Sequence, residues 1–196
     1  MKYAIIGDLH SSIKDLKSVL SHIKEFEEPL EIIGLGDLFE CKIGKRKLAT
    51  LTGPVSLEEA IDPSDDFNAL LTFPTVIGNQ EERIAQVTNL ESYLNYPAEI
   101  SLPNAIVKHG HQFDYTESFE LIPPPFETPI LFFGHSHYSA IYEQGVRTAI
   151  TFDTPYEIDL TKQTIINVGS VVDKQEWVIY DAQKATVTFK KALLLK

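Results

Sequence analysis

Five short segments of the sequence each combine a glycine with side chains that commonly bind divalent metal ions. They are Gly7-Asp8-Leu9-His10, Gly36-Asp37, Gly78-Asn79, His109-Gly110-His111 and Gly134-His135-Ser136-His137. A glycine permits a tight turn and a close approach of the backbone. Carboxylate, amide and imidazole groups together favour manganese, iron, cobalt, nickel or zinc over calcium. The five segments together therefore predict a transition-metal site.

Each of these segments follows an apolar run that is typical of a β-strand. The predicted strands are Lys2–Ile6, Leu30–Leu35, Phe73–Ile77, Ala105–Lys108 and Ile130–Phe133. Ligands that follow parallel strands meet at the carboxyl edge of a sheet. In an extended segment, residues two apart point to the same side. We therefore expect Asp8 with His10, and His135 with His137, each to present two groups on one side.

The remaining elements indicate an α/β chain with a strand-rich second half. Apolar residues at three- and four-residue spacing predict one helix through Ile13, Leu16, Leu20 and Ile23, and another through Ile84, Val87, Leu90 and Leu94. The first helix lies between two predicted strands, which implies a right-handed crossover between parallel strands. Later β-segments are expected at Ala98–Leu102, Ser139–Glu143, Val146–Phe152, Thr164–Asn167, Trp177–Asp181 and Ala185–Lys190. Because no repeat or linker interrupts the chain, residues 1–196 are expected to form one domain.

In this order, the motifs GDLH, GD, GN, HGH and GHSH resemble the calcineurin-like metallophosphoesterase superfamily. The segment Ile166-Asn167-Val168-Gly169-Ser170-Val171, followed by Trp177–Asp181, is similar to the end of its small bacterial and archaeal phosphodiesterases, the branch that the chain resembles most. The resemblance implies a four-layer αββα sandwich of two mixed sheets flanked by helices, with a dinuclear metal site at one sheet edge. It assigns one ion to Asp8, His10 and His137, the second ion to Asn79, His109 and His135, and the bridging position to Asp37. Manganese is the first candidate ion, with iron, zinc, nickel or cobalt as alternatives.

Two such ions can share a hydroxide and stabilise both oxygens of an in-line displacement at phosphorus. The predicted function is therefore a metal-dependent phosphodiesterase or small-molecule phosphatase that uses a metal-bridging hydroxide. Because imidazole ligands must be neutral, activity is expected to fall below about pH 6. The alternative is a non-catalytic, metal-binding protein-interaction scaffold of the same fold, but the intact ligand set favours the enzyme.

The chain departs from the superfamily pattern at the third motif. That motif usually reads Gly-Asn-His, and its histidine protonates the leaving oxygen, whereas this chain has Gln80. Glutamine cannot supply a proton near neutral pH, and general-acid help is typically worth about 10²–10⁴-fold. Either the enzyme favours good leaving groups or His111 partly substitutes. The candidate catalytic residues are thus Asp37, Asn79, Gln80 and His111.

The second motif continues as Asp37-Leu38-Phe39-Glu40, without the arginine found in protein phosphatases, which argues against a phosphoserine phosphatase.

Composition excludes several other classes of protein. The 17 lysines and arginines against 28 acidic residues give a formal charge of −11, which argues against general nucleic-acid binding. No apolar run reaches the roughly 18 residues of a membrane span, and Met1 leads directly into a strand, so a cytoplasmic protein is expected. The single cysteine, Cys41, excludes an intrachain disulfide and a multi-cysteine zinc site.

The expected partner is a small phosphate ester. The sequence indicates no membrane partner and no particular oligomeric state.

Overall fold

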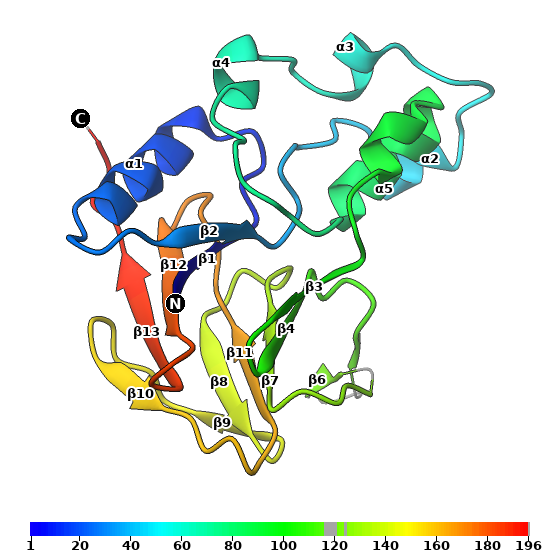
Figure 1. Cartoon of the computed structure of the whole chain (residues 1–196). Helices are drawn as coiled ribbons and strands as arrows, with labels where there is room; N and C mark the ends of the chain where they lie inside the picture. Colours follow the sequence, from blue (N-terminus) through cyan, green and yellow to red (C-terminus); the bar gives the residue numbers. More distant parts are fainter. Residues whose placement is uncertain (116–120, 124, 196) are drawn as a thin grey trace.

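The computed structural model describes residues 1–115, 121–123 and 125–195, which form two facing β-sheets with helices gathered at one end (Figure 1). The first sheet has the strand order β10-β13-β12-β1-β2, and the second has the order β3-β4-β7-β11-β8-β9. Each sheet mixes parallel with antiparallel pairs.

The strands of the first sheet are β1 (Lys2–Ile6), β2 (Glu31–Gly34), β10 (Pro155–Glu157), β12 (Glu176–Asp181) and β13 (Thr186–Lys191). Those of the second sheet are β3 (Glu99–Leu102), β4 (Ala105–Lys108), β7 (Ile130–Phe133), β8 (Ala140–Glu143), β9 (Val146–Thr148) and β11 (Thr164–Asn167). A separate antiparallel pair joins β5 (Asp114–Tyr115) to β6 (Leu121–Ile122). The helices are α1 (Ile13–Lys24), α2 (Lys45–Leu48), α3 (Leu57–Ala60), α4 (Asp65–Asn68), α5 (Asn79–Thr88) and the 3₁₀ helix η1 (Glu91–Leu94).

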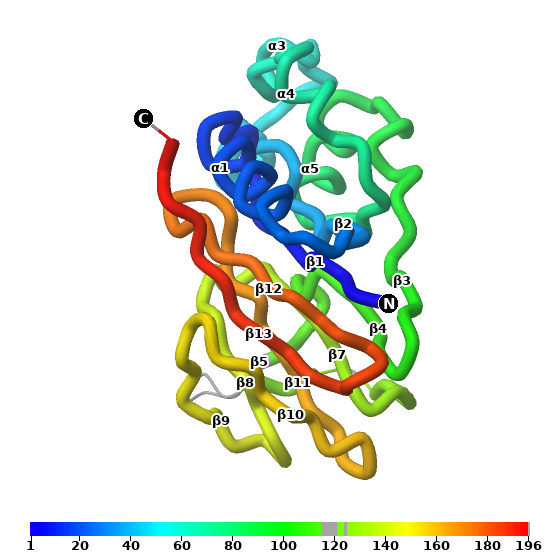
Figure 2. The backbone as a smooth tube through the Cα atoms, turned by 60° about the vertical axis from the view of Figure 1, so that its left-hand side comes forward, coloured from blue at the N-terminus to red at the C-terminus, as the bar shows by residue number. Residues whose placement is uncertain are grey.

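The alternation of side chains along β1 divides the apolar interior into two layers. Ala4 and Ile6 face the helices, where they pack with residues of α1 and with Trp177 of β12. Tyr3 and Ile5 point the opposite way, into the core between the two sheets. Because both faces of β1 are covered, the whole strand after Lys2 is buried. The helical layer and the two facing sheets are also visible when the backbone is turned by 60° (Figure 2).

The two mixed sheets with flanking helices confirm the predicted α/β sandwich. One layer differs from the four-layer expectation. On the outer face of the second sheet, Leu131 and Phe133 pack against Phe113, Leu121 and Phe126. Among the described residues this face is therefore covered by the β5–β6 pair and its flanking segments, and no helix lies there.

The expected strand at Phe73–Ile77 is wrong, since the segment makes only an isolated parallel bridge between Thr75 and Gly34. Pro74 has no N–H to donate, and Ile77 donates instead to the carbonyl of Pro97.

The second predicted helix is too long. Helix α5 ends at Thr88 because Asn89 adopts a left-handed conformation with φ 58°. Leu90 and Leu94 are consequently 40% and 49% exposed and do not continue its buried face.

Several β-segments also have different bounds from those expected. The segment expected at Val146–Phe152 is a strand only over Val146–Thr148, and β10 was not predicted. In the part of the chain that the structure describes, none of the helices has the length and apolar character needed to cross a membrane.

Candidate metal centre

The candidate metal ligands lie on loops at the ends of strands from both sheets. Asp8 and His10 follow β1, and Asp37 follows β2, whereas His109 follows β4 and His135 and His137 follow β7; Asn79 begins α5. Backbone hydrogen bonds tie these loops together. The amides of Leu9 and His10 both donate to the carbonyl of Asp37, at 2.8 and 3.0 Å, and Gly134 donates to His109 at 2.9 Å. Because the His135 backbone amide also donates to Oδ2 of Asp8 at 3.0 Å, the loops form one connected frame.

Asp8, His10 and His137 form a first group whose potential ligand atoms all lie within 4.8 Å of one another. The two Nε2 atoms of His10 and His137 are 3.2 Å apart, and Nε2 of His137 is 3.4 Å from Oδ1 of Asp8. The Glu40 carboxylate accepts a hydrogen bond from Nδ1 of His10, so neutral His10 directs an Nε2 lone pair at its neighbours. Lone pairs and a carboxylate that converge in this way fit a bound cation, and Glu40 orients one of its ligands.

Asp37, His109 and His135 form a second group of the same kind. The Leu35 carbonyl accepts from Nδ1 of His109 at 2.6 Å, which leaves Nε2 of His109 facing Oδ1 of Asn79 at 3.1 Å. Oδ2 of Asp37 is 3.4 Å from Nε2 of His109 and 3.8 Å from Nε2 of His10. The Asp37 carboxylate thus lies between the two groups.

The backbone at five of the seven candidate ligands is left-handed, not extended. The φ angles are 54° at Asp8, 45° at His10, 50° at Asp37, 63° at His135 and 60° at His137. Such angles are uncommon for residues with a side chain, and they cluster at functional sites.

This backbone conformation corrects one expectation from the sequence. An extended backbone would place His135 and His137 on one side, whereas each belongs to a different group, and the superfamily resemblance had also assigned them to different ions. The expected close approach at glycine does occur, since a Cβ atom on Gly78 would lie 2.2 Å from the amide nitrogen of Asp37.

Burial and neighbouring charge give the ionisable side chains of the second ligand group very different pKa values. Burial alone would lower the pKa of His109, but its hydrogen bond to Asp37 and the charges of Asp37 and Asp8 raise it to about 9. Burial and the adjacent His109 lower the pKa of His135 to about 4. Burial opposes ionisation of Asp37, yet the contact with His109 lowers its pKa. The metal-free second group therefore holds a proton on His109 at neutral pH.

The sequence matches the calcineurin-like phosphoesterase superfamily domain over residues 1–187. The chain belongs to the calcineurin-like phosphoesterase superfamily. Among solved structures it is similar to a metallophosphoesterase from Sphaerobacter thermophilus, with 18% identity and a TM-score of 0.69 over 100% of this chain and 89% of the other. It is also similar to YfcE, a phosphoesterase from E. coli, with 16% identity and a TM-score of 0.47 over 92% and 88% of the two chains. None of the curated proteins matches this chain.

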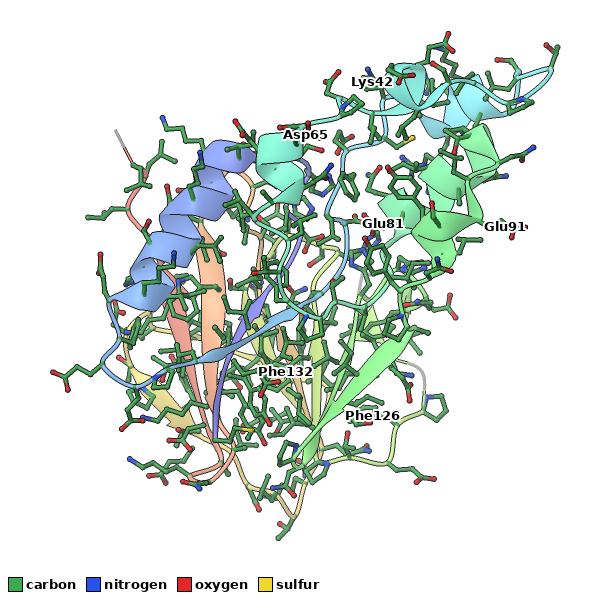
Figure 3. All side chains as sticks on the ribbon, turned by 45° about the horizontal axis from the view of Figure 1, so that its top comes forward. Lys42, Asp65, Glu81, Glu91, Phe126 and Phe132 are labelled. Carbon is green, nitrogen blue, oxygen red and sulfur yellow. The ribbon has the colours of Figure 1, made fainter. Side chains whose placement is uncertain are left out.

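Glu81 holds the Asp37 loop of this calcineurin-like phosphoesterase, and sequence reasoning missed this contact. Its fully buried carboxylate accepts backbone hydrogen bonds from Asp37, Leu38, Phe39 and Gly78 at 2.9–3.2 Å. Figure 3 shows Glu81 at the start of α5. Glu81 lies in the first turn of α5, and the one sequence signal available for it was its position two residues after Asn79. Glu81 therefore fixes the loop that presents Asp37.

Gln80 and His111 both lie beside the second group of this phosphoesterase. The backbone amide of Gln80 donates to Oδ1 of Asp37 at 2.8 Å, whereas the side-chain oxygen of Gln80 accepts from the backbone amide of Cys41 at 3.1 Å. The His111 ring centroid is 5.2 Å from that of His109, and Nε2 of His111 is 3.2 Å from a Glu82 oxygen. Burial and the charge of His109 lower the pKa of His111.

Manganese binding to the second group is expected to weaken as the pH falls from 9 to 7. An ion that binds His109 must displace the proton that a pKa of about 9 keeps there, so affinity should drop by about tenfold for each pH unit. His135, with a pKa of about 4, is neutral over this range and adds no dependence. Calorimetric titration of the metal-free protein with Mn²⁺ at pH 7, 8 and 9, in buffers of different ionisation enthalpy, measures both affinity and proton release. Equal affinity at pH 7 and pH 9 would contradict this expectation.

Proposed function

We propose that this superfamily member hydrolyses small phosphodiesters or phosphomonoesters with the help of two divalent ions, manganese being the first candidate. The observation that carries the proposal is the position of Asp37, whose carboxylate lies within 3.8 Å of an imidazole nitrogen of each ligand group. One carboxylate shared by two clusters of nitrogen and oxygen ligands is what a dinuclear site requires. The superfamily supports a metal-dependent phosphoesterase in general.

In this proposal Asp8, His10 and His137 would hold one ion, Asn79, His109 and His135 would hold the other, and Asp37 would serve both. When bound, the ions supply positive charge for the phosphate oxygens and lower the pKa of water. The chain's own groups orient the ligands. Glu40 and the Leu35 carbonyl hold the imidazoles of His10 and His109 so that Nε2 faces the site. Glu81 holds the Asp37 loop.

The surrounding charge leaves most of the attraction for a phosphate ester to the bound ions. The chain has a net charge of −11 and only three arginines: Arg46, Arg83 and Arg147. Arg46 and Arg147 are exposed, and Arg83 donates to the side chain of Gln80 at 3.5 Å. The described residues therefore contain no pair of arginines aimed at the ligand groups, and the ions would supply most of the positive charge that attracts the phosphate.

The decisive assay compares p-nitrophenyl phosphate with bis(p-nitrophenyl) phosphate. The protein is stripped with a chelator, reloaded with Mn²⁺ and assayed on both esters. Turnover that requires Mn²⁺ supports the enzyme, and the ratio of the two rates gives the preference for monoester or diester. Tight metal binding without turnover of either ester would instead support the protein-interaction scaffold.

Hydrolysis is expected to depend steeply on the pKa of the leaving group. The Gln80 side chain is held by the Cys41 amide and supplies no proton, and His111 has a lowered pKa, so it is neutral at pH 7. A series of aryl and alkyl esters should therefore show rates that fall as the leaving group becomes more basic.

Two variants test which residue matters for this dependence. His111→Ala should change the rates by less than about threefold. Gln80→His should raise the rates of poor leaving groups by about 10²-fold, because a general acid is restored. A flat series in the wild-type protein would remove this part of the proposal, and a large loss in His111→Ala would assign the proton to His111.

A further inference from the structure

An exposed aromatic ring belongs to the residue that follows a candidate ligand of the first group. Tyr138 follows the candidate ligand His137 and is 67% exposed. Among the residues whose side chains the structure describes, it is the one exposed large aromatic residue. Because aromatic rings are normally buried, such a ring at the edge of a candidate active site indicates a contact with another molecule.

A lysine from a distant part of the chain contacts the same two residues. The Nζ atom of Lys174 lies 4.0 Å from the centroid of the Tyr138 ring and donates a hydrogen bond to the carbonyl oxygen of His137. In the described part of the chain, Lys174 has no carboxylate within salt-bridge distance. This acidic protein thus places an ammonium group that has no carboxylate partner against the backbone carbonyl of His137, a candidate metal ligand.

The loop that carries Lys174 is fastened to the ligand loops. The amides of Val171 and Val172 donate to the carbonyls of Gly7 and Asp8, at 2.9 and 3.0 Å. The position of Lys174 is therefore set by the same backbone that presents Asp8.

The two residues that flank Lys174 are both held in the left-handed region. Asp173 has a φ of 64° and Gln175 a φ of 54°. The Asp15 carboxylate, buried in the first turn of α1, secures both of them. It accepts from the Asp173 amide at 3.2 Å and from the Gln175 side chain at 2.7 Å. Strained backbone that persists under such restraint is typical of functional loops.

We propose that Tyr138 and Lys174 form a substrate subsite for a phosphate ester that carries a planar aromatic group, as a nucleotide does. The ring face that Lys174 does not cover stacks on the planar group, and the Lys174 ammonium binds a phosphate oxygen. The subsite selects aromatic over aliphatic esters. This inference rests on the proposed phosphoesterase function, because it needs a phosphate bound beside His137.

Phosphonates test the subsite without hydrolysis, since their carbon–phosphorus bond is not cleaved. Calorimetry on the Mn²⁺-loaded protein compares phenylphosphonate, ethylphosphonate and the methylene phosphonate analogue of AMP. The wild-type protein should bind the two aromatic ligands about tenfold more tightly than ethylphosphonate. Tyr138→Leu should remove that preference and Tyr138→Phe should keep it. Tighter binding of the AMP analogue than of phenylphosphonate would show that the subsite prefers a nucleobase. Tighter binding of phenylphosphonate would show that it prefers a simple aryl group.

Lys174→Gln should weaken the binding of all three phosphonates by about tenfold. Its matched control is Lys184→Gln, which removes the same charge and should have no effect. Lys184 follows the C-terminal end of β12, and this end of the strand is opposite the ligand loops. Equal binding of phenylphosphonate and ethylphosphonate by the wild-type protein, or an undiminished preference in Tyr138→Leu, would overturn the subsite.

Nitrophenyl ester turnover, measured on the same preparations, reports on the proposed function separately. Turnover without an aromatic preference removes only the subsite. An aromatic preference without turnover removes only the enzyme.

Discussion

Asp37→Asn is expected to lower Mn²⁺-dependent turnover of nitrophenyl phosphate esters by at least about 10³-fold, because it removes the one carboxylate that both ligand groups share. The carboxamide oxygen of the variant can still accept the hydrogen bond that the Gln80 amide makes to Oδ1, so the fold should survive. The lost charge faces His109 and His10 through Oδ2. The measurements are kcat/KM for both nitrophenyl esters and the number of manganese ions retained per chain by mass spectrometry.

The matched control for this variant is Asp153→Asn. Asp153 is exposed and pairs with Lys190, and no hydrogen bond or ion pair of the described residues links it to the ligand loops. It should leave turnover and metal content unchanged. If Asp37→Asn retained the wild-type rate and two manganese ions per chain, the shared-carboxylate site would be refuted.

Glu81→Gln is expected to lower the free energy of unfolding by about 3 kcal/mol. Oε1 of Glu81 accepts from the amides of Leu38 and Phe39, and Oε2 accepts from those of Asp37 and Gly78. Glutamine keeps one oxygen, so its NH₂ group has to face two buried backbone donors, each of which loses its acceptor. Urea denaturation of the metal-free protein measures the change as a lower midpoint at an unchanged slope.

The same substitution should reduce turnover by about 10²-fold in the fraction that stays folded, because the Asp37 loop loses its anchor. Glu91→Gln provides the matched control, since Glu91 is an exposed glutamate on the neighbouring η1 (Figure 3). An unfolding free energy and a rate equal to those of the wild type would show that the four amides do not depend on the two carboxylate oxygens of Glu81.

The elements with strong local patterns were predictable from the sequence. The strand at Lys2–Ile6, the helix that begins at Ile13 and the strand at Ile130–Phe133 occur where apolar periodicity places them. Errors arose where a single residue overrode the pattern. Asn89 ends α5 before Leu90, and Pro74 prevents a continuous ladder at Phe73–Ile77. A hydrophobic pattern in the sequence indicates which residues are buried. The end of a helix or strand depends instead on backbone conformation and on available N–H donors.

The sequence by itself determined the candidate ligand set, because glycine turns with metal-binding side chains after apolar strands are a local signal. It also indicated the superfamily. The superfamily resemblance already assigned His135 and His137 to different ions, and only the tertiary structure showed that a left-handed backbone presents them. It alone showed that Glu81 anchors the Asp37 loop and that Lys174 lies over Tyr138. Those contacts join residues 36 to 44 positions apart, and no local pattern encodes which distant amide or ring a side chain will meet.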